Sequence, residues 1–309
     1  MVKEPISISV CIDRVARRME AAGLHYGHGT DNARDEAAWL VLHVLGAPLD
    51  GSFQDWGRVV EPAARQEIER LASERCEGRE PLAYLLGVAW FAGLEFEVSH
   101  DVLVPRSPMA ELILDGCRPW VSPENVSFAL DLCTGSGCIA VALVKCLPNA
   151  WIDASDISPE ALQVAARNIA RHGLQDRVSL IESDLFRSLP PRRYELILAN
   201  PPYVPDAGGA ALPEEYRNEP GLGLFSGPDG LDAVLSILLD APRFLSEDGV
   251  LVCEVGESES ALASALPRVP FLWLEFARGG SGVFVLTRQQ LEEAAAAVAG
   301  LIGERKNVA

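Results

Sequence analysis

From Asp101 onward, short apolar runs alternate with stretches of helical periodicity. A chain that alternates strand and helix in this way builds a parallel sheet joined by crossover helices. The last two apolar runs are separated only by a glycine-rich turn, which is too short for a crossover and allows antiparallel pairing alone. The sequence therefore predicts an α/β sheet, mostly parallel, with an antiparallel last strand. Strands are expected at 128–130, 151–155, 177–181, 194–199, 249–255, 271–276 and 282–287, and helices at 139–147 and 231–245.

The residues before this sheet carry a different pattern. Helical periodicity covers 9–22, 31–45 and 61–77, and two short strand patterns, 88–92 and 95–98, are joined through Gly93. Such a pair of runs around a glycine is typical of a hairpin. We therefore expect a helical domain over 1–86, a linking hairpin over 87–100 and a sheet domain over 101–309.

A glycine-rich turn joins the first strand of the sheet to the helix that follows it. Asp131 ends the strand, and Gly135 and Gly137 let the backbone turn sharply and approach a ligand closely. Two ligand classes fit this loop. The spacing Gly135-x-Gly137-x-x-Ala140 matches a dinucleotide fingerprint, whereas an acid four residues before the first glycine also suits the methionine end of S-adenosylmethionine. A tight turn without a ligand is the third interpretation.

Carboxylates follow the next two strands as well. Asp156 comes at the end of the second strand, where a carboxylate accepts hydrogen bonds from ribose hydroxyls. Asp184 and Leu185 follow the third strand and suit the edge and the face of an adenine ring. Both candidate ligands contain a ribose and an adenine, so these residues do not separate them. A solvated loop acid is the alternative for Asp184.

The fourth strand ends at Asn200-Pro201-Pro202-Tyr203. Two prolines cannot continue a sheet ladder, so they form a stiff turn at the carboxyl end of the strand, where open α/β sheets bind their ligands. The Asn200 amide oxygen, the fixed carbonyls and the Tyr203 ring together form a clamp for a planar group that carries an NH2. An ordinary Asn-Pro turn is the alternative.

One ordered set of residues carries a family resemblance: Asp131, Gly135-Ser136-Gly137, Asp156, Asp184 and Asn200–Tyr203. With this set the chain resembles the class I S-adenosylmethionine-dependent methyltransferases of the HemK/PrmC-like glutamine N-methyltransferase family. The resemblance implies a Rossmann-like seven-stranded sheet and a substrate-recognition role for the N-terminal helices. It also implies a catalytic clamp of Asn200, Pro201, Pro202 and Tyr203. The cofactor-binding residues that it implies are Arg106, Asp131, Cys133, Thr134, Gly135, Ser136, Gly137, Asp156, Ile157, Asp184, Leu185 and Asn200.

Further segments resemble the branch of this family that methylates a glutamine of the third large-subunit ribosomal protein. They include 91–96, 102–108, 218–224, 229–232, 249–256 and 273–276. The sister branch acts on release factors and usually has Pro-Arg-Pro-Asp-Thr-Glu where this chain has residues 105–110. Ala110 therefore occupies the position of the family glutamate, and Glu111 lies one residue later. Cys133 stands where many methyltransferases have glycine.

In the mechanism that the resemblance implies, the methyl group passes directly to the glutamine amide nitrogen. Asn200 Oδ1 and the Pro201 carbonyl would each accept one amide N–H, and Tyr203 would pack against the amide. This arrangement orients a weak nucleophile and separates glutamine from glutamate, because a carboxylate has no N–H to donate.

The composition limits the partners of this chain. Its net charge is −18, which disfavours a strong grip on nucleic-acid phosphates and suits a basic protein substrate, although solubility alone can explain such a charge. No apolar run approaches the roughly 18 residues of a membrane span. The seven cysteines form no Cys-x-x-Cys pair, which indicates a reduced, cytoplasmic protein without a metal site.

Three alternative functions stay open on the sequence. A release-factor glutamine methyltransferase would use the same site. An adenine amino-methyltransferase would use the same clamp, because adenine also presents an NH2, but the acidic charge and the lack of a basic second domain disfavour it. A nicotinamide-dependent dehydrogenase would use the glycine loop and would leave Asn200–Tyr203 unexplained.

Overall fold

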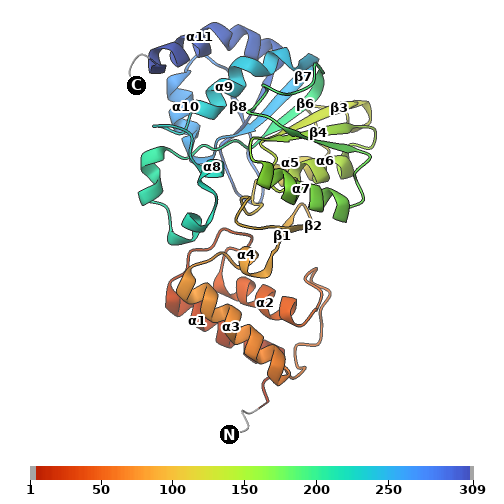
Figure 1. The fold of residues 1–309 in the computed structure, drawn as a ribbon, viewed down its shortest axis with the longest axis vertical. Helices are drawn as coiled ribbons and strands as arrows, with labels where there is room; N and C mark the ends of the chain where they lie inside the picture. The colour runs from red at the N-terminus through yellow and green to blue at the C-terminus, as the bar shows by residue number, and fades with distance from the viewer. Residues whose placement is uncertain (1–4, 307–309) are drawn as a thin grey trace.

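The computed structural model describes residues 5–306 and has a seven-stranded sheet in the order β5-β4-β3-β6-β7-β9-β8 (Figure 1). Neighbouring strands from β5 to β7 pair in parallel, and β9 runs antiparallel to both β7 and β8. This topology confirms the expected class I methyltransferase fold and the antiparallel last strand. The strands are β3 (Phe128–Leu132), β4 (Trp151–Asp156), β5 (Val178–Glu182), β6 (Tyr194–Ala199), β7 (Leu245–Glu254), β8 (Leu272–Trp273) and β9 (Val283–Thr287).

Helices cover both faces of this sheet. On β6, Leu196 and Leu198 pack with α5 and α6, whereas Ile197 and Ala199 pack with the helices on the opposite face. All four side chains are fully buried, which explains why a parallel central strand is apolar without alternation. The first face carries α5 (Met109–Leu114), α6 (Cys138–Cys146) and α7 (Pro159–Arg171), and the second carries α9 (Asp232–Asp240), α10 (Glu259–Ala265) and α11 (Arg288–Lys306).

The N-terminal part forms a separate helical layer below the sheet in Figure 1. Its helices are α1 (Ile8–Ala22), α2 (Ala33–Val44), α3 (Pro62–Gly78) and α4 (Leu82–Leu86). Their apolar core continues into the hairpin through Val88 and Val98 and reaches Val164 of α7. The side chains of Ser7 and Asn32 cap the first two helices by accepting backbone N–H groups. These helices confirm the three helical patterns of the sequence, with small shifts at their ends.

A hairpin of β1 (Val88–Phe91) and β2 (Leu94–Glu97) joins the two parts. Asn168 on α7 fixes it, because its side chain accepts the Glu97 N–H at 2.7 Å and donates to the Glu97 carbonyl at 2.9 Å. The same amide also donates to the Ser136 carbonyl at 2.9 Å. Asn168 therefore connects the hairpin to the glycine-rich loop of the sheet.

The sequence-based element bounds were wrong in three places. The helix expected over 231–245 ends at Asp240, because Pro242 cannot continue it and a 3-10 turn leads into β7. Strand β7 begins at Leu245 rather than at residue 249. The strand expected over 271–276 is only Leu272–Trp273.

The 206–224 segment was not anticipated. It leaves the sheet after β6 and forms η2 (Asp206–Ala210), η3 (Glu214–Asn218) and α8 (Gly221–Leu224). A bridge between Val204 and Phe225 closes its base, where Val204 N–H also donates to the Leu224 carbonyl at 2.8 Å. Figure 1 shows this segment reaching from the sheet part toward the N-terminal helices.

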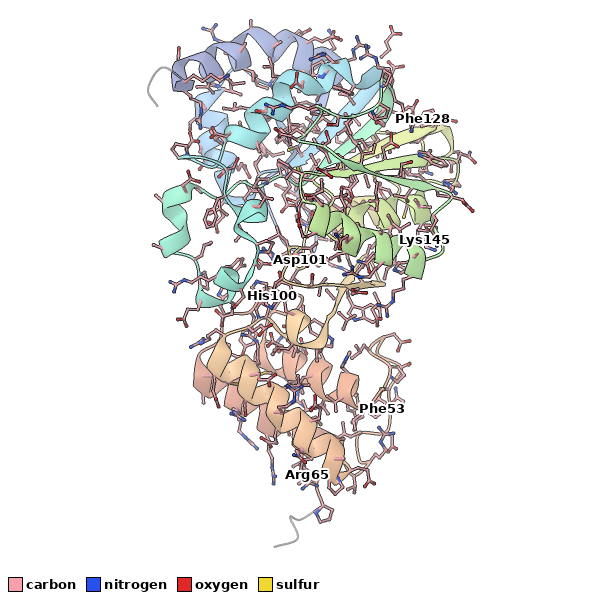
Figure 2. All side chains as sticks on the ribbon, viewed as in Figure 1. Phe53, Arg65, His100, Asp101, Phe128 and Lys145 are labelled. Atoms are coloured by element: carbon pink, nitrogen blue, oxygen red, sulfur yellow. The ribbon has the colours of Figure 1, made fainter. Side chains whose placement is uncertain are left out.

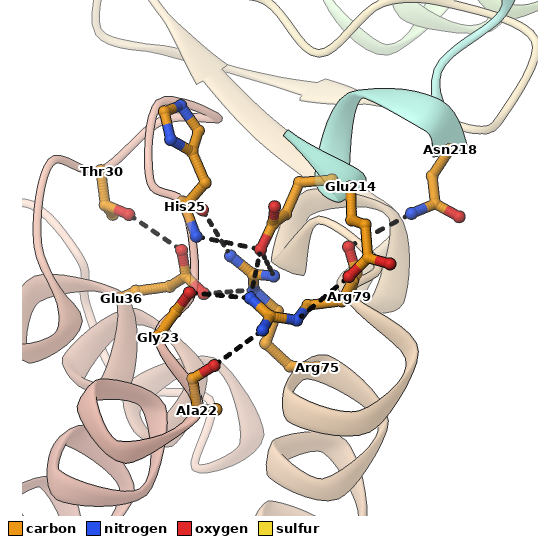
Figure 3. Close-up of polar contacts among 10 residues, drawn as sticks. Ala22, Gly23, His25, Thr30, Glu36, Arg75, Arg79, Glu214 and Asn218 are labelled. Atoms are coloured by element: carbon orange, nitrogen blue, oxygen red, sulfur yellow. Dashed lines mark hydrogen bonds and ion pairs between the residues drawn. The ribbon is translucent and has the colours of Figure 1, made fainter. Parts of the chain in front are cut away.

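A buried ion cluster joins this segment to the N-terminal helices (Figure 3). Arg75 on α3 is 1% exposed; it donates to Glu36 Oε1 at 2.6 Å and lies 3.5 Å from Glu215 Oε1. Arg79 reaches the same Glu215 oxygen at 3.3 Å and donates to the Gly23 carbonyl at 2.8 Å. The cluster therefore binds η3 to the ends of α1 and α3. Within residues 5–306, no helix is both long and apolar enough to cross a membrane.

Replacing Arg75 tests the contribution of this cluster to stability. Arg75→Met keeps much of the side-chain volume but leaves Glu36 buried without its cation and Glu215 with Arg79 alone, so we expect a loss of about 3–5 kcal/mol in unfolding free energy. Urea unfolding at neutral pH measures the loss. Arg70→Ala on the same helix removes only exposed ion pairs with Glu67 and Glu74 and should change stability little. Equal losses in the two variants would contradict this role.

Candidate active site

A pocket of about 450 Å³ lies where β3, β4 and β6 end. The connection after β3 leads to β4 on one side, and the connection after β6 leads to β7 on the other, so the strand order reverses between β3 and β6. An open α/β sheet binds its ligand at the carboxyl edge of such a reversal. The pocket also takes wall residues from 101–107, from 220–226 and from the end of β7. Figure 2 shows His100 and Asp101 at the level where the N-terminal helices approach the sheet part.

Asp131 lies behind the glycine-rich loop rather than on the pocket wall. It is fully buried, and its Oδ2 accepts the Thr134 hydroxyl at 2.5 Å and the Ala140 N–H at 2.9 Å. These bonds fold the loop over the start of α6. Burial raises the pKa of Asp131 to about 7, although both hydrogen bonds oppose the shift. Its Oδ1 has no hydrogen-bond partner in the part of the chain that the structure describes.

The loop needs its glycines. Gly137 has φ +79°, and a Cβ there would lie 3.3 Å from Ala165 Cα on α7. Gly135 has φ +53°, and its N–H donates to Asp156 Oδ2 at 2.9 Å. Cys133 has a φ of 64°, in the left-handed region. Only glycine adopts this region without a steric cost, which explains why many methyltransferases have glycine at this position. Of the loop residues expected to bind the cofactor, Cys133, Thr134, Gly135 and Ser136 line the pocket, whereas Gly137 does not.

The residues after β4 and β5 form the adjoining wall. Asp156 Oδ1 accepts the Ser158 N–H at 3.0 Å, so this carboxylate is held between the loop and the start of α7. Burial raises the pKa of Asp156 despite these bonds. Ile157 and Leu185 present apolar surface to the pocket, and Leu185 has a left-handed φ of 48°. Asp184 lines the pocket and forms an ion pair with Arg187 at 2.6 Å.

The Asn200–Tyr203 turn forms the opposite wall. The Asn200 side chain lines the pocket, and nothing in residues 5–306 hydrogen-bonds it; only its backbone N–H is engaged, at 3.4 Å from the Leu132 carbonyl. Pro202 and Tyr203 also line the pocket, whereas Pro201 is buried and contributes no wall surface. The structure thus leaves an amide group free beside the glycine-rich loop.

Tyr203 is held on several sides. Its hydroxyl donates to Glu254 Oε1 at 3.1 Å, and its carbonyl accepts the Ser258 hydroxyl at 2.7 Å. Its ring lies so close to Gly256 that a Cβ there would come within 2.6 Å. The ring therefore has one position available, which suits a residue that packs against a planar ligand.

Sequence reasoning missed two carboxylates near the pocket. Glu254 ends β7 beside β6 and bonds Ser107 as well as Tyr203, and burial raises its pKa. Glu254 lies at the end of a parallel strand, and this position could have marked it in the sequence as a candidate site residue. Glu219 binds Arg106 through both of its oxygens, at 2.5 and 2.7 Å, and no local pattern marks it. Glu111 lies away from the pocket and accepts the N–H groups of Ala277 and Arg278.

The raised pKa of Asp131 predicts a pH dependence of stability. Folding favours the protonated carboxyl, so the folded chain should lose stability as pH rises from about 4, the ordinary value, toward about 7. Asp131→Asn stays neutral throughout. Wild type should therefore lose stability relative to this variant as pH rises across that interval in urea unfolding.

The exposed Asp248→Asn is the matched control and should follow wild type. A stability difference between wild type and Asp131→Asn that does not change with pH would show that Asp131 ionises as an ordinary carboxyl.

Comparison with known families agrees with this geometry. Residues 121–211 match the model of the methyltransferase small domain, and residues 17–87 match that of the PrmC N-terminal domain. Three relatives carry the name ribosomal protein uL3 glutamine methyltransferase. One from Xylella fastidiosa is 50% identical over 94% of this chain and 93% of its own. Those from Bordetella pertussis and Neisseria gonorrhoeae are 47% and 48% identical, each over 89% of this chain and 92% of their own.

This degree of identity extends along nearly the whole chain and establishes the family. The class I sheet and the pocket at its carboxyl edge agree with it. The chain belongs to the ribosomal protein uL3 glutamine methyltransferase family.

Proposed function

We propose that this protein transfers the methyl group of S-adenosylmethionine to the side-chain amide nitrogen of a glutamine in ribosomal protein uL3. The observation that carries this proposal is the Asn200 amide, which lines the pocket beside the Tyr203 ring and has no side-chain hydrogen bond to any of residues 5–306. The relatives named for this activity share about half of their residues with this chain.

The pocket residues fit the cofactor. Asp156 keeps lone pairs for the ribose hydroxyls, and Ile157, Asp184 and Leu185 suit the adenine. The buried Asp131 Oδ1 has no donor among the described residues, and the amino group of a methionine end would supply one. Cys133, Thr134, Gly135 and Ser136 approach the same end from the loop, and Arg106 offers N–H groups to its carboxylate. When bound, the sulfonium supplies an electrophilic methyl group.

The clamp residues position the acceptor. Asn200 Oδ1 accepts one N–H of the glutamine amide and directs the nitrogen along the line of attack. The Pro201 carbonyl was expected to accept the other N–H, but Pro201 does not line the pocket, so Asn200 carries the orientation. Tyr203 packs on the amide and excludes water. Such alignment supplies at most roughly 7–11 kcal/mol. No strong base is needed before attack, because the proton leaves afterwards from a cationic nitrogen.

The N-terminal domain (1–86) and the hairpin (87–100) are the parts that recognise the protein substrate, and 101–309 is the catalytic domain. A net charge of −18 attracts a basic ribosomal protein and speeds encounter more than it strengthens binding. The acceptor is uL3 in the cytoplasm, before or during ribosome assembly.

The alternatives have less support. Release-factor methylation would use the same pocket, but the relatives at 47–50% identity are named for uL3. An adenine amino-methyltransferase needs a basic surface, which the net charge of −18 opposes. The dehydrogenase interpretation leaves the free Asn200 amide without a role.

Loss of the Asp156 carboxylate tests the cofactor assignment. Asp156→Ala should weaken S-adenosylmethionine binding by about 1.5–3 kcal/mol, as expected for hydrogen bonds to a charged group. Calorimetric titration measures this loss, with the exposed Asp176→Ala as control. An unchanged dissociation constant, or tight binding of a nicotinamide dinucleotide instead, would refute the assignment.

Two substitutions at Asn200 test the clamp. Asn200→Ala should lower turnover on uL3 by about 10²-fold or more, as for the loss of one preorganised hydrogen-bonding group. Cofactor affinity should change little, because the contact is to the acceptor. Asn200→Asp still accepts a hydrogen bond and should retain more activity than Asn200→Ala.

The clamp assay should offer both uL3 and a nucleic acid, with the exposed Asn149→Ala as control. Methyl transfer to the nucleic acid alone would overturn the glutamine assignment. Full activity of Asn200→Ala on uL3 would remove the clamp mechanism.

A further inference from the structure

Two buried carboxylates on the 206–224 segment bind different arginines. Glu215 is 1% exposed and binds Arg75 and Arg79 of the N-terminal part. Glu219, four residues later, is 5% exposed and binds Arg106 of the pocket. A buried carboxylate is costly unless it is paired, so both ends of η3 are fixed in place by their cations.

Glu219 sets the direction of the Arg106 guanidinium. Its two oxygens take Nη1 and Nη2 at 2.5 and 2.7 Å, and Nη1 also donates to the Val104 carbonyl at 3.3 Å. The guanidinium lies over the Tyr216 ring, 5.1 Å from its centroid. Arg106 lines the pocket, and these bonds leave some of its N–H groups for a ligand.

The N-terminal part touches the same carboxylate. His28, in the loop between α1 and α2, is 3% exposed, and its Nε2 lies 3.7 Å from Glu219 Oε2, too far for a hydrogen bond. Within residues 5–306 neither ring nitrogen has a hydrogen-bond partner, so the contact with Glu219 is electrostatic. Its ring also packs on Tyr216, with 4.6 Å between the centroids. Burial alone would raise the pKa of Glu219, but His28 and Arg106 outweigh it and lower the pKa to about 2. The carboxylate is therefore held ionised between the two parts of the chain.

We propose that Glu219 is a positioning residue through which the N-terminal domain, by way of His28, orients Arg106 toward the carboxylate of the methionine end of the cofactor. This inference rests on the proposed function. It gives the N-terminal domain a second role besides recognition of the substrate: it completes the pocket wall that binds the cofactor.

The test compares two ligands on the full chain by calorimetry. S-adenosylhomocysteine carries the amino-acid carboxylate, and 5′-methylthioadenosine lacks the whole amino-acid end. Glu219→Gln should weaken S-adenosylhomocysteine binding about 10-fold, near the lower limit for one hydrogen bond between charged groups. His28→Phe keeps the ring on Tyr216 and should weaken it about 3-fold. Binding of 5′-methylthioadenosine should stay within about 2-fold in both.

A double-mutant cycle supplies the readout that a general loss of structure would not give. In an Arg106→Ala background, His28→Phe should cause no further loss of S-adenosylhomocysteine affinity, because its effect passes through Arg106. His100→Phe is the control, since His100 lies at the same junction and contacts Glu80 and the Asn218 carbonyl rather than Glu219. If Glu219→Gln does not fold, His28→Phe, which keeps the ion pair, carries the test.

The outcomes separate this inference from the proposed function. If wild type binds neither ligand, both fail. Suppose that wild type binds S-adenosylhomocysteine. If His28→Phe and Glu219→Gln then weaken the binding of both ligands by the same factor, or of neither ligand, the positioning role is wrong and the proposed function stands. Additive losses in the Arg106→Ala background would also refute it.

Discussion

Burial of negative charge organises this acidic protein. A carboxylate removed from water must find cations or hydrogen-bond donors, and the buried ones named here have such partners. Asp131 takes donors from the glycine-rich loop and so shapes it. Glu254 takes the Tyr203 and Ser107 hydroxyls and fixes the clamp. Glu215 and Glu219 take arginines from two different parts of the chain. The glycine-rich loop, the Asn200–Tyr203 clamp and the junction with the N-terminal helices are therefore all held in place by the partners of buried carboxylates.

The sequence predicted the sheet and one edge of the pocket for a clear reason. Asp131, Asp156, Asp184 and Asn200 lie at or just beyond the carboxyl ends of parallel strands. Such ends share one edge of the sheet, so local patterns sufficed to bring these residues together. The structure places three of them on the pocket wall and Asp131 directly behind it.

What the sequence could not predict depends on segments without periodicity. The family resemblance assigned Arg106 to the cofactor, but the path of 101–107 that brings Arg106 and Ser107 to the pocket has no regular pattern. The partners of Glu215 lie 140 and 136 residues away along the chain, at Arg75 and Arg79, so no local rule links them. The helix over 231–245 was overextended because apolar periodicity outweighed the warning given by Pro242.

The closed base of the 206–224 segment has an evolutionary consequence. Because the Val204–Phe225 bridge joins its two ends, the segment leaves and re-enters the rest of the domain at the same positions, whatever the length of the chain between them. Lengthening such an excursion costs little in chain entropy, since that cost grows only with the logarithm of length. Mutations inside it can therefore reshape the pocket rim and the contact with the N-terminal helices together, while β6 and β7 stay in register. The length and sequence of this excursion can therefore change during evolution while the strands that carry the site keep their positions.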